Sequence, residues 1–287
     1  MKIKTSFFLI LITLFSSCSL DRFIIRQTGT ILDYGVIALY EENDLVLAET
    51  ALASNIKLLE GMLKGDPENT KLRLLTAQAL SGYALGFVED TEPERARNLY
   101  IRARDHARQV LRMNDAFAQK ENGNLEEFEQ AVTNFEADDI DALFWTSFSW
   151  AGWINLSISD PQAFIDLPKV QIMMQKVMDM DETYFHGSPL LFFGSLWGMK
   201  PRMLGGDPDK AKEFFDRNIE ITEKKFLLSY IYYARFYAEK TLNEEVFDEC
   251  IKIIEETPAD VLPEYQLLNV IAKKKAVRLK EMREDLF

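Results

Sequence analysis

Apolar residues recur at intervals of three and four along most of the chain, and only short turns rich in Gly, Pro and Asp break this spacing. Because an α-helix has about 3.6 residues per turn, such spacing places the apolar side chains on one helix face. In residues 44–63 the pattern ends at Gly65-Asp66-Pro67, a sequence that stops a helix. Alternating patterns typical of strands are short, so we predict an all-α protein of about 10–12 helices.

The pattern predicts a series of helices over residues 44–63, 70–88, 94–112, 125–134, 142–158, 169–180, 189–199, 209–225, 227–241, 244–256 and 264–285. Residues 21–40 suit either a helix or an extended docking segment. Before residue 94, Thr91 is predicted to cap the next helix, with Pro93 in its first turn. Residues 114–141 are polar and predict an inserted loop within a single domain, residues 18–287.

The N-terminus has the pattern of a secretory signal peptide. Lys2 and Lys4 precede an apolar run from Phe7 to Phe15, and Ser16-Ser17-Cys18 follows. The run is shorter than the roughly 20 apolar residues that span a bilayer. A cysteine directly after small residues is typical of a bacterial lipobox, in which the thiol is acylated and the signal is removed. We therefore predict a signal peptide at 1–17 and a lipoprotein anchored at Cys18. The alternative is an ordinary signal peptide or anchor with an incidental cysteine.

The formal net charge of −13 makes nucleic acid an unfavourable partner, because an acidic surface repels phosphate backbones. The same charge favours membrane attachment through acyl chains on Cys18, on the periplasmic side of a bacterial membrane. Cys250 is the other cysteine, and its helical context predicts a buried structural thiol. The two histidines, His106 and His186, are too few and too far apart for a zinc site, so we expect no metal and no cofactor.

No catalytic motif stands out in the sequence. Gly205-Gly206-Asp207 is a weak match to a phosphate-binding loop, because it carries an aspartate where donors are needed. A tight turn in which Asp207 caps the next helix, with Pro208 at its first position, explains the same residues better. The sequence therefore favours a protein that is not an enzyme.

Aromatic residues gather in three of the predicted helices. Core packing explains most of them, although Trp and Tyr together also suit an apolar cavity with a few polar groups. The residues predicted to line a ligand tunnel are Trp145, Phe148, Trp150, Trp153, Phe192, Phe193, Trp197, Tyr230 and Tyr233.

A small–aromatic–small pattern occurs twice at spacings of four and three. It is formed by Ala96, Tyr100 and Ala103, and again by Ala211, Phe215 and Asn218. The pattern resembles the second helix of a tetratricopeptide repeat, in which a small residue lets the partner helix approach. The repeats are irregular, so the alternatives are degenerate tetratricopeptide-like hairpins and a generic helical array.

Four further stretches occur in a distinctive order along the chain. They are 55–63 with 66–69, then 77–90, then 96–103, and finally 204–211 with Phe214-Phe215. Each alone is weakly specific, but the ordered set extends over nearly the whole chain. Together with the lipobox it resembles the T component of TRAP-transporter-associated periplasmic lipoproteins, the TatT family.

This resemblance implies an all-helical bundle of cryptic tetratricopeptide repeats that forms a homotrimer. It also implies docking to a P-type TRAP substrate-binding protein and a tunnel that passes a small hydrophobic ligand, with no catalytic residues. Two rival functions remain open. One is a helical-repeat scaffold that binds a protein or peptide, and the other is an envelope assembly factor of helical-repeat type.

Overall fold

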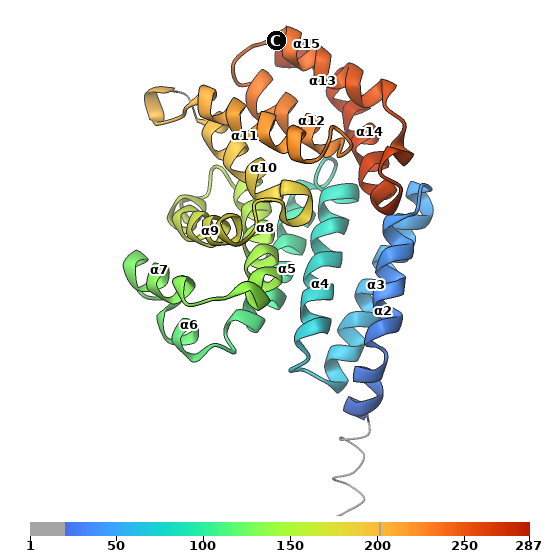
Figure 1. Cartoon of the computed structure of the whole chain (residues 1–287), viewed down its shortest axis with the longest axis vertical. Coiled ribbons are helices and arrows are strands. Elements are labelled where there is room, and N and C mark those ends of the chain that lie inside the picture. Colours follow the sequence, from blue (N-terminus) through green and yellow to red (C-terminus); the bar gives the residue numbers. More distant parts are fainter. Residues whose placement is uncertain (1–20, 201) are drawn as a thin grey trace, which may run out of the picture.

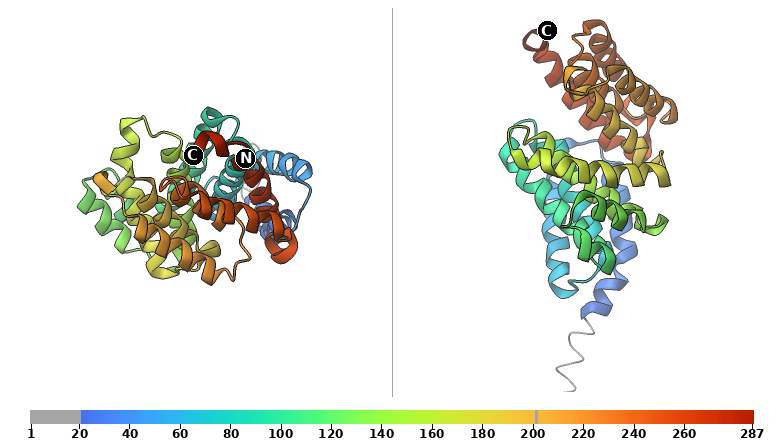
Figure 2. Two further views of the ribbon diagram at one scale, coloured as in Figure 1. Left: turned by 90° about the horizontal axis from the view of Figure 1, so that it is seen from above. Right: turned by 90° about the vertical axis from the view of Figure 1, so that its left-hand side faces the viewer.

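The computed structural model describes residues 21–200 and 202–287, and these residues form an all-α bundle without strands. The bundle is elongated, and the first described residues and the C-terminus lie at opposite ends of its long axis (Figures 1 and 2). The N-terminal helices fill the lower part of Figure 1 and the C-terminal helices fill the upper part. The predicted fold class is confirmed. The predicted signal peptide and Cys18 lie outside the described residues.

The helices follow one another through short turns. They are α2 (Gly29–Tyr40), α3 (Leu45–Gly65), α4 (Thr70–Tyr83), α5 (Pro93–Leu111), α6 (Asp115–Lys120), α7 (Leu125–Thr133), α8 (Ile140–Asn155), α9 (Pro161–Met180), α10 (Tyr184–Met199), α11 (Pro208–Ile221), α12 (Leu228–Tyr233), α13 (Glu244–Glu256), α14 (Gln266–Glu281) and α15 (Arg283–Leu286). Residues 21–27 are also helical and lead into α2, so the segment 21–40 is helix rather than extended chain.

Side-chain caps explain where several helices begin. Asp44 accepts hydrogen bonds from the backbone N–H groups of Val46 and Leu47 at the start of α3. Asp207 accepts one from Lys210 at the start of α11, so the capping interpretation of its loop is confirmed. The predicted Thr91 cap of α5 is wrong. Glu92 occupies the N-cap position, and the Thr91 hydroxyl points back to the carbonyl of Val88.

Residues 114–141, predicted as an inserted loop, contain the short helices α6 and α7. Phe117, Phe128 and Phe135 pack their rings together there, with centroids 5.4–5.7 Å apart, and all three are buried. Glu121 is also buried and accepts hydrogen bonds from Arg108 of α5 and from Arg112, which directly follows α5. The segment therefore has apolar and ionic contacts of its own with the bundle.

Two of the helices end in a wider turn of the same kind. α4 passes into a π-helical turn at Ala84–Val88, and α12 passes into one at Ala234–Ala238. The predicted single helices 70–88 and 227–241 are therefore each interrupted by a change of hydrogen-bond register. Such π-bulges are rare and frequently occur at functional sites.

Small residues permit close crossings in the two most extensively packed helix pairs. A Cβ added at Gly152 of α8 would lie 2.7 Å from ring atoms of Tyr100 of α5. A Cβ added at Gly194 of α10 would lie 3.0 Å from the ring of Phe215 of α11. The two aromatic residues are those of the small–aromatic–small pattern, and each is buried. The α5–α8 and α10–α11 pairs thus form the cores of the lower and upper parts of the bundle.

Candidate ligand cavity

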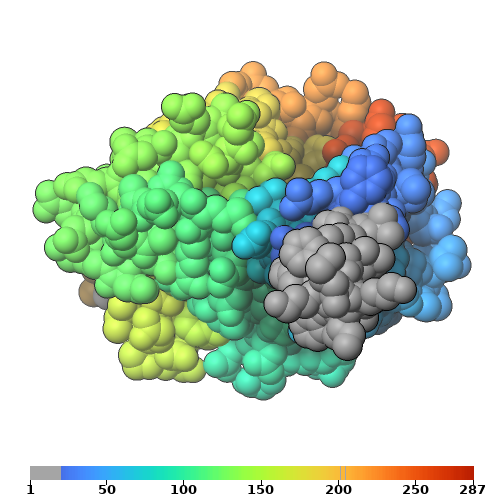
Figure 3. Space-filling model, turned by 90° about the horizontal axis from the view of Figure 1, so that it is seen from below, coloured from blue at the N-terminus to red at the C-terminus, as the bar shows by residue number. Residues whose placement is uncertain are grey.

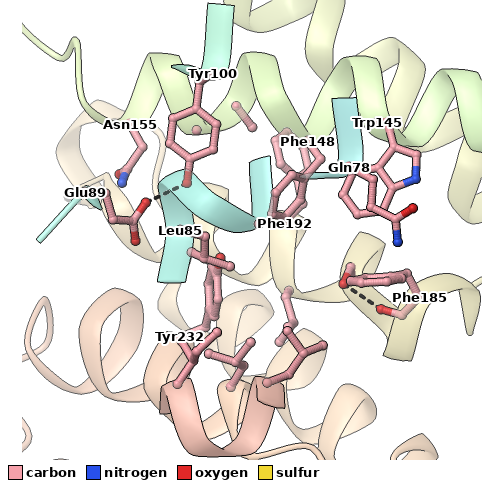
Figure 4. A pocket seen from close by; sticks show the side chains of 18 of the residues that line it. Gln78, Leu85, Glu89, Tyr100, Trp145, Phe148, Asn155, Phe185, Phe192 and Tyr232 are labelled. Carbon is pink, nitrogen blue, oxygen red and sulfur yellow. Dashed lines mark hydrogen bonds between the residues drawn. The ribbon is translucent and has the colours of Figure 1, made fainter. Parts of the chain in front are cut away.

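A cavity of about 760 Å³ lies between the lower and upper parts of the bundle. Figure 4 shows it enclosed by α4 and α8 on one side and by the C-terminal helices on the other. Its walls are mainly apolar, and side chains from α2, α3, α9, α10 and α14 complete them. Its volume is within the range of about 300–1,000 Å³ that is usual for small-molecule sites.

Both π-helical turns contribute to the cavity wall. Leu85 lies in the first turn and Glu89 directly follows it, whereas Arg235 lies in the second turn and Glu239 directly follows it. The wider backbone turns therefore present side chains at matching positions toward one space. Tyr232, one turn before Arg235, completes this part of the lining (Figure 4).

A buried polar cluster lies on the wall beside the first π-turn. The Tyr100 hydroxyl donates to Glu89 Oε2 at 2.6 Å (Figure 4). Lys275 Nζ of α14 donates to Glu89 Oε1 at 2.8 Å and to Asp90 Oδ2 at 2.7 Å. The Lys275 side chain is only 5% exposed. The cluster links α14 to the residues that follow the first π-turn, and it gives the apolar cavity one charged, hydrogen-bonded region.

The tyrosines of the cavity are held in their neutral form. Burial first, and then the negative charge of Glu89, raises the pKa of Tyr100 well above its usual range. Burial likewise raises the pKa of Tyr232, with a smaller contribution in the same direction from Glu89. Both phenols therefore keep their protons at physiological pH and can donate hydrogen bonds.

A second polar contact lies elsewhere on the lining. Gln78 of α4 donates through Nε2 to the hydroxyl of Tyr40 at 2.7 Å. Burial raises the pKa of Tyr40, and its ring centroid lies 4.9 Å from that of Tyr265. Gln78 and Tyr40 both line the cavity, so this part of the wall carries an amide and a phenol within apolar surroundings.

A left-handed backbone corner positions one aromatic side chain of the wall. Phe185, His186 and Gly187 all have positive φ, at 43°, 59° and 66°. Asn218 of α11 stabilises the corner, because its amide donates to the carbonyls of His186 and Gly187 at 2.8 and 2.9 Å. Strain of this kind costs free energy and persists only where the surroundings hold it.

The corner turns Phe185 into the cavity wall and His186 away from it. The Phe185 ring lies 5.1 Å from the Trp145 ring, and both line the cavity (Figure 4). His186 stacks on Phe226 at 4.6 Å and meets the edge of Tyr265 at 4.3 Å. Burial lowers the pKa of His186 to about 4, so the imidazole is neutral at physiological pH.

The structure brings three of the nine predicted tunnel residues to the cavity and places six in other surroundings. Trp145, Phe148 and Phe192 line it (Figure 4). Trp150 instead donates its indole N–H to Asp166 at 2.9 Å and lies under Arg104 and Arg108.

The remaining five pack within the bundle, outside the cavity lining. Phe193 stacks on Phe214, Tyr233 stacks on Phe215, and Trp197 carries Lys210 over its ring at 4.6 Å. Trp153 and Tyr230 are buried in the core. Along one helix only the side chains at the right angle reach the cavity, which explains why Phe192 lines it and Phe193 does not.

Several lining residues were missing from the sequence-based set, namely Gln78, Glu89, Tyr100, Phe185, Tyr232, Arg235 and Lys275. Glu89 and Lys275 are 186 positions apart in the chain, so no local pattern links them. The π-turns carry no recognisable sequence signal. Gly187 was a usable hint for the corner, because glycine favours positive φ.

Within the described residues, no group of three or more His, Cys, Asp or Glu side chains is arranged to hold a metal ion. Among the same residues, no helix is both long enough and apolar enough to cross a bilayer. Cys250 is buried, and burial raises its pKa to about 12, so the thiol is not a reactive group.

The fold and the cavity together define an all-α protein that encloses an apolar space of small-molecule size. The family model described as "TRAP transporter T-component" matches residues 41–287, and the chain therefore belongs to this family. A comparison with curated proteins finds no match. Membership associates the protein with a TRAP transport system, in the non-enzymatic role of a transporter component.

Proposed function

We propose that this protein is a lipid-anchored periplasmic accessory of a TRAP-type uptake system. In this proposal it docks a P-type substrate-binding protein and passes a small apolar ligand through a tunnel that includes the cavity. The observation that carries the proposal is the apolar cavity of about 760 Å³ between the two parts of the bundle, in a member of the T-component family.

The distribution of exposed lining residues supports passage rather than permanent enclosure. Ile31 and Leu58, on α2 and α3, line the cavity and are more than half exposed. Ile158, between α8 and α9, and Phe164, in the first turn of α9, also line the cavity and are more than half exposed. Apolar side chains that are at once lining and exposed mark where an apolar ligand can reach the cavity from outside.

Attachment to the membrane would come from acyl chains on Cys18. The net charge of −13 opposes binding to anionic lipid headgroups, so a covalent lipid is the better anchor. A homotrimer in which each protomer presents tetratricopeptide-like helical pairs would provide the docking surface for the P-type protein. Substitution of Cys18 by alanine should release the protein from the detergent phase.

The ligand proposal is tested by native mass spectrometry of the purified protein and by titration with a fluorescent apolar probe. Leu85→Trp places a larger side chain on the cavity wall, and Leu74→Trp makes the same change on α4 outside the lining. We expect Leu85→Trp to weaken probe binding and Leu74→Trp to leave it unchanged. Equal binding by both variants, with no co-purified ligand, would contradict a role for the cavity.

The partner proposal needs a separate measurement with the cognate P-type protein. Size-exclusion chromatography with light scattering should report a trimer alone and a larger assembly when the P-type protein is added. Binding of another envelope protein in place of the P-type protein would instead favour a helical-repeat scaffold.

A further inference from the structure

The first described helix has an apolar outer surface that no part of the described chain covers. Residues 21–40 run along the outside of the bundle (Figure 1), and the dark-blue residues lie at the surface beside α3 (Figure 3). Their inner side packs through Ile25, Leu32 and Leu39. The outer side, here called the outer stripe, consists of the exposed residues Phe23, Ile24, Gln27, Thr30, Ile31, Tyr34, Ile37 and Ala38.

The outer stripe is continuous and free of charge. At roughly 100° per residue, its members lie within one arc of the helix, and Arg26 and Asp33 fall at the edge of that arc. Arg26 donates to Asp66, and Lys71 donates to Asp33, so both flanking charges are paired with groups on the bundle. A helix that is apolar on its packed side and also on its outer side requires a second apolar environment.

The stripe also adjoins the cavity. Ile31 belongs to both, with 68% of its surface exposed, and Leu58 of α3, which is 56% exposed, lines the same cavity. Val36 and Leu39, on the inner side of the same helix, continue the lining inward. One apolar surface therefore runs from the outside of helix 21–40 into the cavity.

The distance to the proposed lipid anchor identifies what covers the stripe. Only Ser19 and Leu20 stand between Cys18 and Asp21, so three residue steps, at most about 11 Å, separate the acylated residue from the helix. Phe23 and Ile24, in the first turn, are then held at the bilayer surface. An interfacial helix buries its apolar face about 5–10 Å into the headgroup region, which suits Phe, Ile and Tyr side chains.

We propose that the outer stripe of helix 21–40 lies in the interface of the bilayer that carries the anchor, so that the cavity opens toward lipid at Ile31 and Leu58. This inference rests on the proposed function, because it requires acylation of Cys18. It assigns the source of the ligand: an apolar molecule would be exchanged with the membrane rather than with bulk water.

Lipid contact is tested with full-length acylated protein in phosphatidylcholine vesicles. Ile31→Cys, Tyr34→Cys and Ile37→Cys are labelled with bimane, and Leu242→Cys, at a 70% exposed position in the C-terminal part, is the control. Cys250 is buried and stays unlabelled. We expect dibrominated phosphatidylcholine to quench emission at the three stripe positions and to leave the control emission unchanged.

Three results would overturn the inference. The first is that the stripe labels are not quenched although the mass of the N-terminal peptide shows acylation. In that case the proposed anchor stands and only the lipid contact of the stripe is wrong. The second is shielding of the labels without vesicles that grows with protein concentration, because a second copy would then cover the stripe. The third is an unacylated Cys18, which would contradict both the anchor and this inference.

The opening is tested by Leu58→Trp, which adds bulk where the cavity meets the surface. Val46→Trp is the matched control, because Val46 lies on the same helix, is 75% exposed and is not part of the lining. We expect Leu58→Trp to slow the uptake of an apolar dye from vesicles and Val46→Trp to have no effect. Equal uptake rates in both variants would show that ligand does not enter at this position.

Discussion

The ring of Tyr100 on α5 lies against the backbone of Gly152 on α8, and both residues line the cavity. A Cβ at position 152 would stand 2.7 Å from two ring atoms, which is closer than real contacts allow. The same tyrosine donates a hydrogen bond to Glu89 at 2.6 Å. Close helix packing and the polar cluster of the cavity thus depend on one side chain.

We expect Gly152→Ala to destabilise the protein by about 1–3 kcal/mol, because the Tyr100 ring must move and weaken its bond to Glu89. Gly61→Ala on α3 is the control, since a Cβ there meets nothing within 4 Å. That control should raise stability by about 0.5–1 kcal/mol through helix propensity alone. Urea unfolding of both variants provides the comparison, and equal stabilisation by both would refute the packing account.

The ion pairs of Lys275 should contribute far more to stability than an exposed pair on the same helix. Lys275→Met leaves Glu89 and Asp90 without their cation, and we expect a loss of about 3 kcal/mol. Lys280→Met removes an exposed pair with Glu255 and should cost less than about 1 kcal/mol. Thermal and urea unfolding measure both, and similar small losses would show that the cluster is effectively solvated.

Two phenylalanines from the sequence-based set should behave differently because only one lines the cavity. Phe148→Ala removes apolar lining, so we expect the affinity for an apolar probe to fall by about tenfold. Phe193→Ala leaves the lining intact and removes a buried ring that stacks on Phe214, at a cost of about 3 kcal/mol. Probe titration and urea unfolding are both required. If folded Phe193→Ala loses probe binding and Phe148→Ala keeps it, the assignment of the binding site to the cavity is contradicted.

Acid should destabilise the fold through His186. Its folded pKa of about 4 is below the unfolded value of about 6.5, so the unfolded state takes up a proton first as the pH falls. Unfolding free energy should therefore drop by about 2 kcal/mol between pH 7.5 and 5 from this group. In His186→Asn, which tolerates the positive φ, that part of the drop should disappear. An unchanged pH profile in the variant would show that another group is responsible.

The sequence predicted the helices well because the information for a helix is local. Asp44 and Asp207 are capping residues next to apolar periods, and Pro208 suits the first helical position, so the starts of α3 and α11 could be located closely. The π-turns that interrupt residues 70–88 and 227–241 were not predictable from the sequence. A single π-turn changes the backbone hydrogen bonds locally and leaves the spacing of apolar residues almost unchanged.

The aromatic clusters show the limit of the sequence in predicting the site. Phe192 and Phe193 are equally apolar neighbours, yet only Phe192 lines the cavity, because the choice depends on how α10 is rotated against α11. The sequence pattern alone could assign both residues to buried positions, but it could not say which of them faces protein and which faces empty space.

The amino-acid sequence by itself therefore determined the all-α class, the order of helices and the small residues that permit close crossings, since each follows from short-range periodicity and side-chain size. Tertiary structure alone decided the cavity. Glu89 meets Lys275, and Phe185 meets Trp145, only after helices remote in the chain have packed together. Such contacts depend on helix rotation and on a strained corner, which are set by the summed packing of the whole bundle.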